Sequence, residues 1–127
     1  MARPPHPGPT ERELTLFKIL WNLGPSTVRR IREAFPAQRR PAHTSVQTNL
    51  QGMLEKGYVT RQTGEPGHVY AAALSREEVE RSAVRDLLGR VFDGSALRLI
   101  TTVLQQDQAS PAELRRLQAA LEEAARD

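Results

Sequence analysis

The sequence predicts a mainly α-helical fold, in which three helices and a β-hairpin are followed by three further helices. Helix-start signals recur along the chain as the capping boxes T-E-R-E at 10–13, S-R-E-E at 75–78 and S-P-A-E at 110–113. Apolar side chains follow each of them at helical spacing. One segment, residues 58–71, instead has two strand-like runs around a turn that contains Gly and Pro.

Composition indicates a soluble globular protein. The chain has 127 residues, of which 39% are hydrophobic and 26% are charged, and it has no cysteine. It has no run of about 18 apolar residues, and its start, MARPPHPGP, lacks the apolar core of a secretory signal. We therefore expect no membrane span and a cytoplasmic location. The lack of cysteine excludes disulfides, thiolate metal sites and cysteine nucleophiles.

The first domain is expected to span residues 10–74, after a disordered tail at 1–9 that holds four prolines. Thr10 is the predicted N-cap of the first helix, and Gly24-Pro25 is the predicted stop. The expected apolar stripe of this helix consists of Leu14, Phe17, Leu20 and Trp21.

Two further helices are expected before the hairpin. Ser26 is the predicted N-cap of the second, whose buried side is Val28, Ile31 and Phe35 and whose end is at Pro36. After a loop at 37–43, Thr44 is the predicted N-cap of the third. The inward side chains of the third helix are expected to be Val46, Leu50, Met53 and Leu54, with Gly57 as the terminating C′ glycine.

The hairpin is expected to have strands at 58–62 and 68–71, joined by the turn TGEPG at 63–67. A second, helical domain is expected at 75–127. Its helices begin at the capping residues Ser75, Ser95 and Ser110. Their apolar positions are Val79, Val84, Leu87, Leu88 and Val91, then Leu97, Ile100 and Leu104, then Leu114, Leu117 and Leu121.

Three helices followed by a hairpin make a winged helix-turn-helix, whose third helix enters the major groove of DNA. On a helical wheel, Thr48 points away from the inward side, with Thr44, Ser45, Gln51 and Gly52 around it and Gln47 and Asn49 at the borders. Base edges are read by short amide and hydroxyl groups of this kind. The same residue types also favour helix starts for purely structural reasons, so the pattern alone does not decide between the two interpretations.

The charge distribution, like the helix pattern, indicates nucleic-acid binding. Residues 1–74 hold ten Lys and Arg against five Asp and Glu, whereas residues 75–127 hold eight against ten. The basic half is the expected contact surface for a polyanion. Candidate contacts to the DNA backbone are Arg29, Arg30, Arg39, Arg40, Arg61 and His68.

Catalysis and cofactor binding are not expected. The histidines at 6, 43 and 68 lack the spacing of metal ligands, and no nucleophile–base set, carboxylate pair or phosphate-binding glycine loop is evident. Two other binding functions remain as alternatives. The neutral helix could dock a protein partner, an option that Gly52 keeps open, or the chain could sense a small molecule, which would need a pocket.

Several stretches carry a family resemblance in combination: LTLFKILWNLGPSTVRRIREAF, HTSVQTNLQGMLEKGYVTRQ, GHVYAAALSREE and LLGRVFDGSALRLI. They resemble the penicillinase-repressor family of BlaI/MecI-like transcriptional regulators. The resemblance implies a homodimer that binds an inverted-repeat operator in double-stranded DNA and represses β-lactamase or other resistance or stress genes. It also implies base contacts from Thr44, Ser45, Gln47 and Thr48. The residues that it places between the two chains of the dimer are Leu97, Ile100, Leu104, Leu114, Leu117 and Leu121.

Three departures bear on what the resemblance implies. The family usually has Arg-Leu where this chain has Gly52-Met53, so the effect on affinity and operator sequence stays open. Members that are induced by a protease are cut at an Asn-Phe bond, and the matching bond here is Thr102-Val103, so an inducing protease stays an open partner. A copper-responsive branch has a C-terminal cysteine cluster, which this chain lacks.

Overall fold

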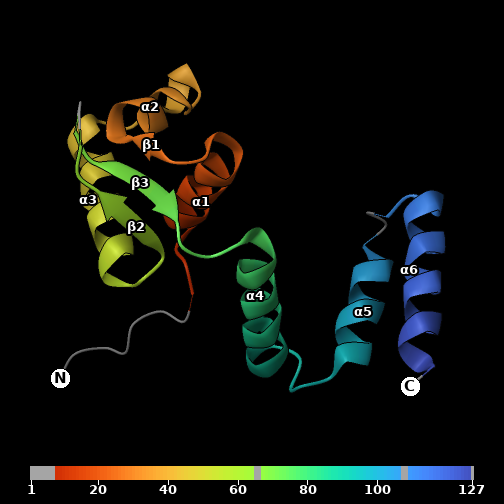
Figure 1. The fold of residues 1–127 in the computed structure, drawn as a ribbon. Helices are drawn as coiled ribbons and strands as arrows, with labels where there is room; N and C mark the ends of the chain where they lie inside the picture. The colour runs from red at the N-terminus through yellow and green to blue at the C-terminus, as the bar shows by residue number, and fades with distance from the viewer. Residues whose placement is uncertain (1–7, 65–66, 107–108, 127) are drawn as a thin grey trace. The chain divides into compact units, whose positions relative to one another are not determined.

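The computed structural model describes residues 8–64, 67–106 and 109–126, and it confirms a mainly helical fold with a small sheet (Figure 1). Most of the predicted tail and part of the predicted turn at 63–67 lie outside the described residues. In chain order, the elements are α1 (Glu11–Leu23), β1 (Ser26–Thr27), α2 (Val28–Glu33), the 3₁₀ helix η1 (Ala37–Arg39), α3 (His43–Glu55), β2 (Val59–Gln62), β3 (Val69–Ala72), α4 (Arg76–Arg90), α5 (Ala96–Gln105) and α6 (Pro111–Ala125).

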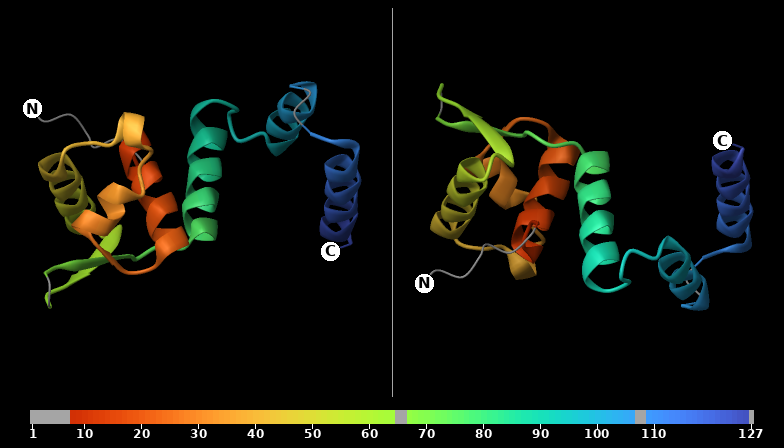
Figure 2. Two further views of the ribbon diagram at one scale, coloured as in Figure 1. Left: turned by 90° about the horizontal axis from the view of Figure 1, so that it is seen from above. Right: turned by 90° about the horizontal axis from the view of Figure 1, so that it is seen from below.

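The chain divides into two compact units between Asp86 and Leu87. The first unit contains α1 to β3 and most of α4, and it has the arrangement of a winged helix-turn-helix (Figure 2). The second contains the end of α4 with α5 and α6. The boundary predicted at 74/75 therefore precedes α4, whereas the compact units divide inside it.

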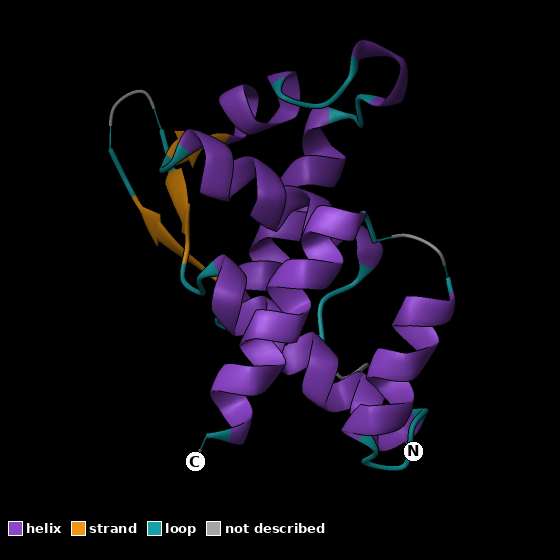
Figure 3. Cartoon of the chain, turned by 90° about the vertical axis from the view of Figure 1, so that its right-hand side faces the viewer, coloured by secondary structure: helices purple, strands orange, loops and turns teal. Residues whose placement is uncertain are grey.

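The sheet of the first unit has three antiparallel strands in the order β1-β3-β2. Its strands are drawn in orange in Figure 3. The hairpin was expected, and its strands lie one residue further along than predicted at their starts. The third strand was not expected. Ser26 and Thr27 pair with Tyr70 and Val69, so the segment before α2 extends the hairpin into a sheet.

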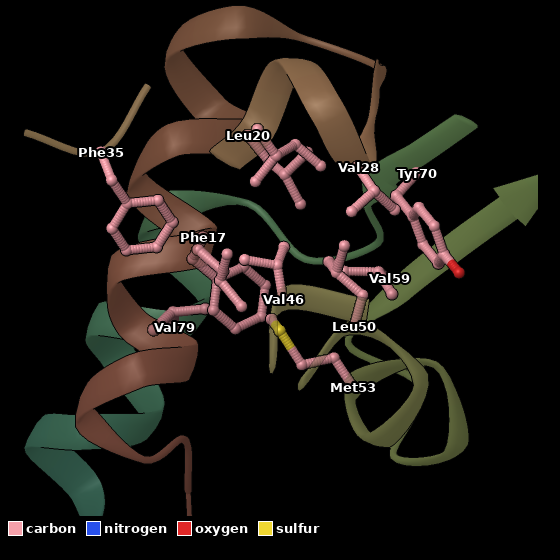
Figure 4. Packing of buried hydrophobic residues seen from close by; sticks show 12 residues of the cluster. Phe17, Leu20, Val28, Phe35, Val46, Leu50, Met53, Val59, Tyr70 and Val79 are labelled. Atoms are coloured by element: carbon pink, nitrogen blue, oxygen red, sulfur yellow. The ribbon is translucent and has the colours of Figure 1, made fainter. Parts of the chain in front are cut away.

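The core of the first unit is aliphatic with a few aromatic rings (Figure 4). It draws on all three N-terminal helices, the two hairpin strands and one residue of α4, Val79. The buried apolar residues are Leu16, Phe17, Leu20, Val28, Ile31, Phe35, Val46, Leu50, Met53, Val59, Tyr70 and Val79. The predicted inward residues of the second and third helices are buried, apart from Leu54, which is partly buried. Phe35, however, follows α2, which ends at Glu33 and not at Pro36 as predicted.

The buried side of α1 differs from the prediction. Leu16 is fully buried and was not expected, whereas Leu14 and Trp21 are only partly buried. The Trp21 ring stacks on Phe17 in the core, with the ring centroids 5.2 Å apart. At the edge of the core, its indole Nε1 donates to the Leu74 carbonyl oxygen at 2.9 Å. A buried indole N–H needs such an acceptor, and this one joins α1 to the segment before α4.

Two predicted helix caps are wrong. Thr27, not Ser26, caps α2, because Ser26 is buried in β1 and its hydroxyl donates to the Gly24 carbonyl oxygen at 2.9 Å. Thr44 does not cap α3, because the N-cap lies two residues earlier, at an extended Ala42 that offers no side-chain hydrogen bond, and the helix begins at His43. The predicted loop at 37–43 accordingly contains η1 and the first residue of α3.

The end of α3 follows the sequence prediction closely. Gly57 has a φ of +79°, the left-handed conformation that favours glycine. The Tyr58 amide donates to the Met53 carbonyl oxygen at 2.8 Å and the Gly57 amide to that of Leu54 at 3.1 Å. These two bonds form a Schellman motif, which ends the helix and directs the chain into β2.

The helix starts in the C-terminal part of the chain also agree with the prediction. Ser75 and Glu78 exchange the two hydrogen bonds of a capping box, as do Ser110 and Glu113 at the start of α6. Ser95 caps α5 through the Arg98 amide. Among the described residues, no helix is long and apolar enough to cross a membrane.

Candidate nucleic-acid interface

Helix α3 presents two chemically different sides. Val46, Leu50 and Met53 are fully buried and fix the helix against the core. The opposite side carries the four predicted base-contacting residues, and all of them are exposed: Thr44, Ser45, Gln47 and Thr48. The first acidic residue of the helix is Glu55, at its last position. The exposed side of its first two turns is therefore polar and carries no carboxylate.

The hydroxyl of Thr48 is already engaged within the helix. Its Oγ1 donates to the Thr44 carbonyl oxygen at 2.9 Å. A threonine hydroxyl has one proton and two lone pairs. With the proton used in this bond, Thr48 can offer a base edge acceptor lone pairs and its methyl group, but no donor.

The hairpin contacts one flank of α3. Arg61 on β2 donates from Nη1 to Gln51 Oε1 at 3.2 Å, and Gln51 Nε2 donates to Glu55 Oε2 at 3.3 Å. His68 Nδ1 lies 3.2 Å from Thr63 Oγ1. A hollow separates hairpin and helix, and its lining residues are Gln47, Thr48, Gln51, Gly52, Glu55, Arg61, His68 and Tyr70. Two of the predicted backbone contacts, Arg61 and His68, therefore border the exposed side of α3.

The arginines before α3 have different surroundings. Arg40 donates from Nη2 to the carbonyl oxygens of Glu33 at 3.0 Å and Phe35 at 3.1 Å, so it stabilises the end of α2. Arg39, on η1, is exposed and borders a separate hollow beside Phe35 and Pro36. These two neighbours, which the sequence pattern treats alike, therefore differ in how freely their side chains can meet a ligand.

The arginines at the start of α2 are both exposed. Arg29 pairs with Glu33 one turn later, at 3.2 Å between Nε and Oε2. Such an exposed pair on one helix contributes little to stability, but it partly offsets the charge of Arg29. Within the described part of the chain, no hydrogen bond or ion pair joins Arg29 or Arg30 to α3.

An ion pair that the sequence pattern did not indicate holds the C-terminal end of α3. Lys56 Nζ lies 2.8 Å from Glu13 Oε2, and the Glu13 side chain is 7% exposed. Burial raises the pKa of Glu13, but hydrogen bonds from Lys56 and Thr10 and the charge of Lys56 outweigh it, so the pKa lies below its ordinary value of 4.5. The pair joins the first turn of α1 to the end of α3.

The residues predicted to lie between two chains are not buried in the second unit. Leu97 is 76% exposed, and Leu104, Leu114 and Leu121 are each more than 40% exposed. Ile100 and Leu117 are half-buried. Further exposed apolar residues that the prediction did not include among these contacts are Val84, Leu87, Val91 and Val103. In residues 87–106 and 109–126, no side chain is fully buried.

The sequence is similar to known proteins over most of its length. A sequence model of the family described as penicillinase repressor matches residues 9–123. Two relatives named transcriptional regulator BlaI come from Mycobacterium tuberculosis strains CDC 1551 / Oshkosh and ATCC 25618 / H37Rv. Each is 33% identical over 113 residues, which span 87% of this chain and 82% of the relative. The winged helix-turn-helix, the extent of this match and the shared identity together show that the chain belongs to the penicillinase repressor family and is a transcriptional regulator, not an enzyme.

Proposed function

We propose that this repressor acts in the cytoplasm as a homodimer that binds an inverted-repeat operator in double-stranded DNA. The observation that carries the proposal is the exposed side of α3, where hydroxyl and amide groups replace the charged groups of an ordinary solvated helix. Thr44, Ser45, Gln47 and Thr48 contact base edges, since short neutral donors and acceptors match the pattern of the major groove. Repression follows from occupancy of the promoter.

Contacts to the DNA backbone come from the basic side chains around α3. Arg61 and His68 lie beside the hollow between α3 and the hairpin, and Arg39 and Arg40 precede the helix. Arg29 and Arg30 at the start of α2 complete the set. Such contacts set the register of the protein on the duplex but carry no direct sequence information. They also make binding strongly dependent on salt, because each neutralised phosphate releases a counterion.

Dimerisation uses the apolar sides of α5 and α6. Leu97, Leu104, Leu114 and Leu121 are too exposed for a helical unit that encloses its own core. Rows of exposed leucine at helical spacing mark a surface that another helix covers. Burial of these residues and of Ile100 and Leu117 against a second chain brings two α3 helices to sites about 34 Å apart, or a multiple of that distance.

The regulated genes are β-lactamase genes, in keeping with the family's description as penicillinase repressor, or other resistance or stress genes. Release by an inducing protease would require a local change in α5. The bond Thr102-Val103 lies inside α5, where the Thr102 hydroxyl donates to the Arg98 carbonyl oxygen at 2.7 Å. A protease needs an extended substrate, so this part of α5 would have to unwind before cleavage.

A mobility-shift experiment tests the proposal directly. The probe is a duplex from the region upstream of the chain's own gene, compared with a scrambled duplex of the same composition. We expect the upstream duplex to be bound at least about 1,000-fold more tightly, as for specific DNA-binding proteins. Equal affinity for the two duplexes at physiological salt would contradict operator recognition.

A further inference from the structure

Arg12, in the first turn of α1, lies against the exposed side of α3. Its Nη1 donates to Asn49 Oδ1 at 3.4 Å, and its guanidinium carbon lies 5.6 Å from the centre of the Phe35 ring. The two contacts come from different elements, so they restrict the side chain on two sides. The hollow beside Arg12 is lined by polar residues alone: Arg12, Thr44, Ser45, Thr48 and Asn49.

Arg61 makes a matching contact on the other flank of the same helix. It donates to the side-chain oxygen of Gln51 at 3.2 Å, as Arg12 donates to that of Asn49. At about 100° per residue, Asn49 and Gln51 lie roughly 160° apart around the helix axis, with Thr48 between them. The exposed side of α3 is thus bordered by two guanidinium groups, each supplied by a different neighbouring element.

Neither guanidinium is neutralised by its contact. An amide oxygen orients the arginine but leaves its charge intact, in contrast to Arg29, which pairs with a carboxylate. In the part of the chain that the structure describes, no ion pair involves Arg12. Each contact uses one of the five N–H donors of its guanidinium, so four remain for another ligand.

Helix stability does not account for Arg12. A cation in the first turn of a helix faces the positive end of the helix dipole, at a cost of about 0.3–1 kcal/mol. Glu11 and Glu13 in the same turn are the residue type that this position favours. Besides its contacts with Asn49 and Phe35, Arg12 has donors that a further ligand can use.

We propose that Arg12 binds a backbone phosphate of DNA, on the strand opposite to that bound by Arg61. A helix in the major groove, which is about 12 Å wide, has one phosphate strand on each side. The two arginines stand on those two sides, already oriented and still charged. This inference rests on the proposed function, because it requires α3 to lie in the groove, and it extends the DNA-binding surface to α1.

The test compares Arg12→Gln with Lys18→Gln, which removes one positive charge from the exposed side of the same helix at a distance from α3. The probe is a fluorescently labelled duplex of arbitrary mixed sequence, about three turns or 30 base pairs long. Because phosphate contacts are independent of sequence, this probe reports them without an identified operator. Affinity is measured by anisotropy over a series of salt concentrations.

We expect Arg12→Gln to weaken binding at low salt by roughly fivefold to tenfold. We also expect it to reduce the slope of log K against log salt by about 0.9 for each bound chain. Lys18→Gln should leave the slope within error of the parent. Arg12→Lys should keep the slope, since it keeps the charge.

Circular dichroism and Trp21 fluorescence check the fold of each variant. If Arg12→Gln disturbs the packing on Phe35, Arg12→Met, which keeps an aliphatic stem on the ring, takes its place. If a folded Arg12→Gln or Arg12→Met chain keeps the salt slope of the parent, the inference about Arg12 is wrong, while the proposed function still stands. The same holds if Lys18→Gln reduces the slope as much as Arg12→Gln does. If the parent chain binds no duplex even at low salt, the proposed function fails and this inference fails with it.

Discussion

Thr48 illustrates how a single side chain can be limited to part of its chemistry by the helix that carries it. Because its hydroxyl proton is used in the bond to the Thr44 carbonyl oxygen, the side chain can only accept a hydrogen bond or pack its methyl group. Adenine and cytosine present amino donors in the major groove, and thymine presents a methyl group. Thr48 is therefore suited to those bases and not to a guanine edge, which offers only acceptors.

Replacement of Thr48 by Ala tests this role. We expect a loss of about 1–3 kcal/mol in binding to the operator and little change on a duplex of random sequence. Thr101→Ala, at an exposed position of α5, is the matched control. Equal losses on both duplexes, measured by anisotropy, would show that Thr48 contacts only the DNA backbone.

The pair of Glu13 and Lys56 gives the N-terminal unit a pH dependence whose direction follows from the lowered pKa of Glu13. A group whose pKa is lower in the folded chain stabilises the fold above its unfolded value. That stabilisation is lost as the pH falls below about 4.5 and through the folded value. At pH 7, Glu13→Gln should lower the free energy of unfolding by about 1–2 kcal/mol.

Urea unfolding followed by the fluorescence of Trp21, the only tryptophan of the chain, measures this effect in the N-terminal unit. The difference between parent and Glu13→Gln should be largest near pH 7 and should shrink toward pH 3. Glu11→Gln removes an exposed carboxylate from the same turn and should show a smaller difference. A Glu13→Gln effect of the same size at both pH values would argue against the ion pair as its source.

The limits of sequence reasoning at this scale are set by distance along the chain. Periodicity identified the buried Val46, Leu50 and Met53 correctly, because their partners follow from one helix alone. It missed Glu13 with Lys56, which are 43 residues apart, and Arg12 with Asn49, which are 37 apart. Contacts of this kind depend on how the helices pack, which no local pattern contains.

At the scale of elements, helix starts were predicted well where two signals agreed. The capping boxes of α1 and α6 combine a hydroxyl residue with a glutamate three positions later, and both form as expected. Ser26 and Thr27 are adjacent and both suit an N-cap. The choice of Thr27 follows from the pairing of Ser26 with Tyr70, on a strand more than 40 residues later. A two-residue strand such as β1 has no periodicity from which to predict it.

The segment before α3 yields a prediction for two neighbouring arginines. Arg39→Ala should weaken binding to all duplexes and reduce the salt slope by about one, with little change in stability. Arg40→Ala should also lower the free energy of unfolding by about 1 kcal/mol, because it removes a donor from the carbonyl oxygens of Glu33 and Phe35. The double variant should lose the most affinity.

Anisotropy over a salt series and urea unfolding, applied to each single variant, separate the two effects. Gln38→Ala, between α2 and α3, serves as an uncharged control from the same segment. If the double variant binds like the parent at every salt concentration, these arginines do not contact phosphate.

For the whole molecule, the decisive contrast is between the two units. The first has a closed core of aliphatic and aromatic side chains. Among the described residues of the second, no side chain is fully buried. Helical periodicity predicted the apolar positions of α5 and α6. It does not tell whether the residues that bury them belong to the same chain or to another one. We expect a second copy of the chain to bury the exposed apolar sides of these helices, which include Leu97 and Leu121.

Leu121→Asp should weaken that association. A carboxylate placed in an apolar interface loses its hydration without gaining a partner, so the dimer dissociation constant should rise at least about 100-fold. Ala119→Asp introduces the same charge on the opposite side of α6 and should leave the dimer intact. Sedimentation equilibrium gives both constants, and a monomeric parent chain or an equal effect of the two variants would refute this interface.

Hydroxyl-radical footprinting on the DNA upstream of the chain's own gene tests the central claim most directly, since it shows at once whether α3 enters DNA and whether two copies do so. We predict two protected segments related by two-fold symmetry, with centres about 10 base pairs or a multiple of this apart. Thr48→Ala should abolish both at the concentration that protects with the parent chain. A single asymmetric segment, or no protection at concentrations that saturate nonspecific binding, would contradict the account.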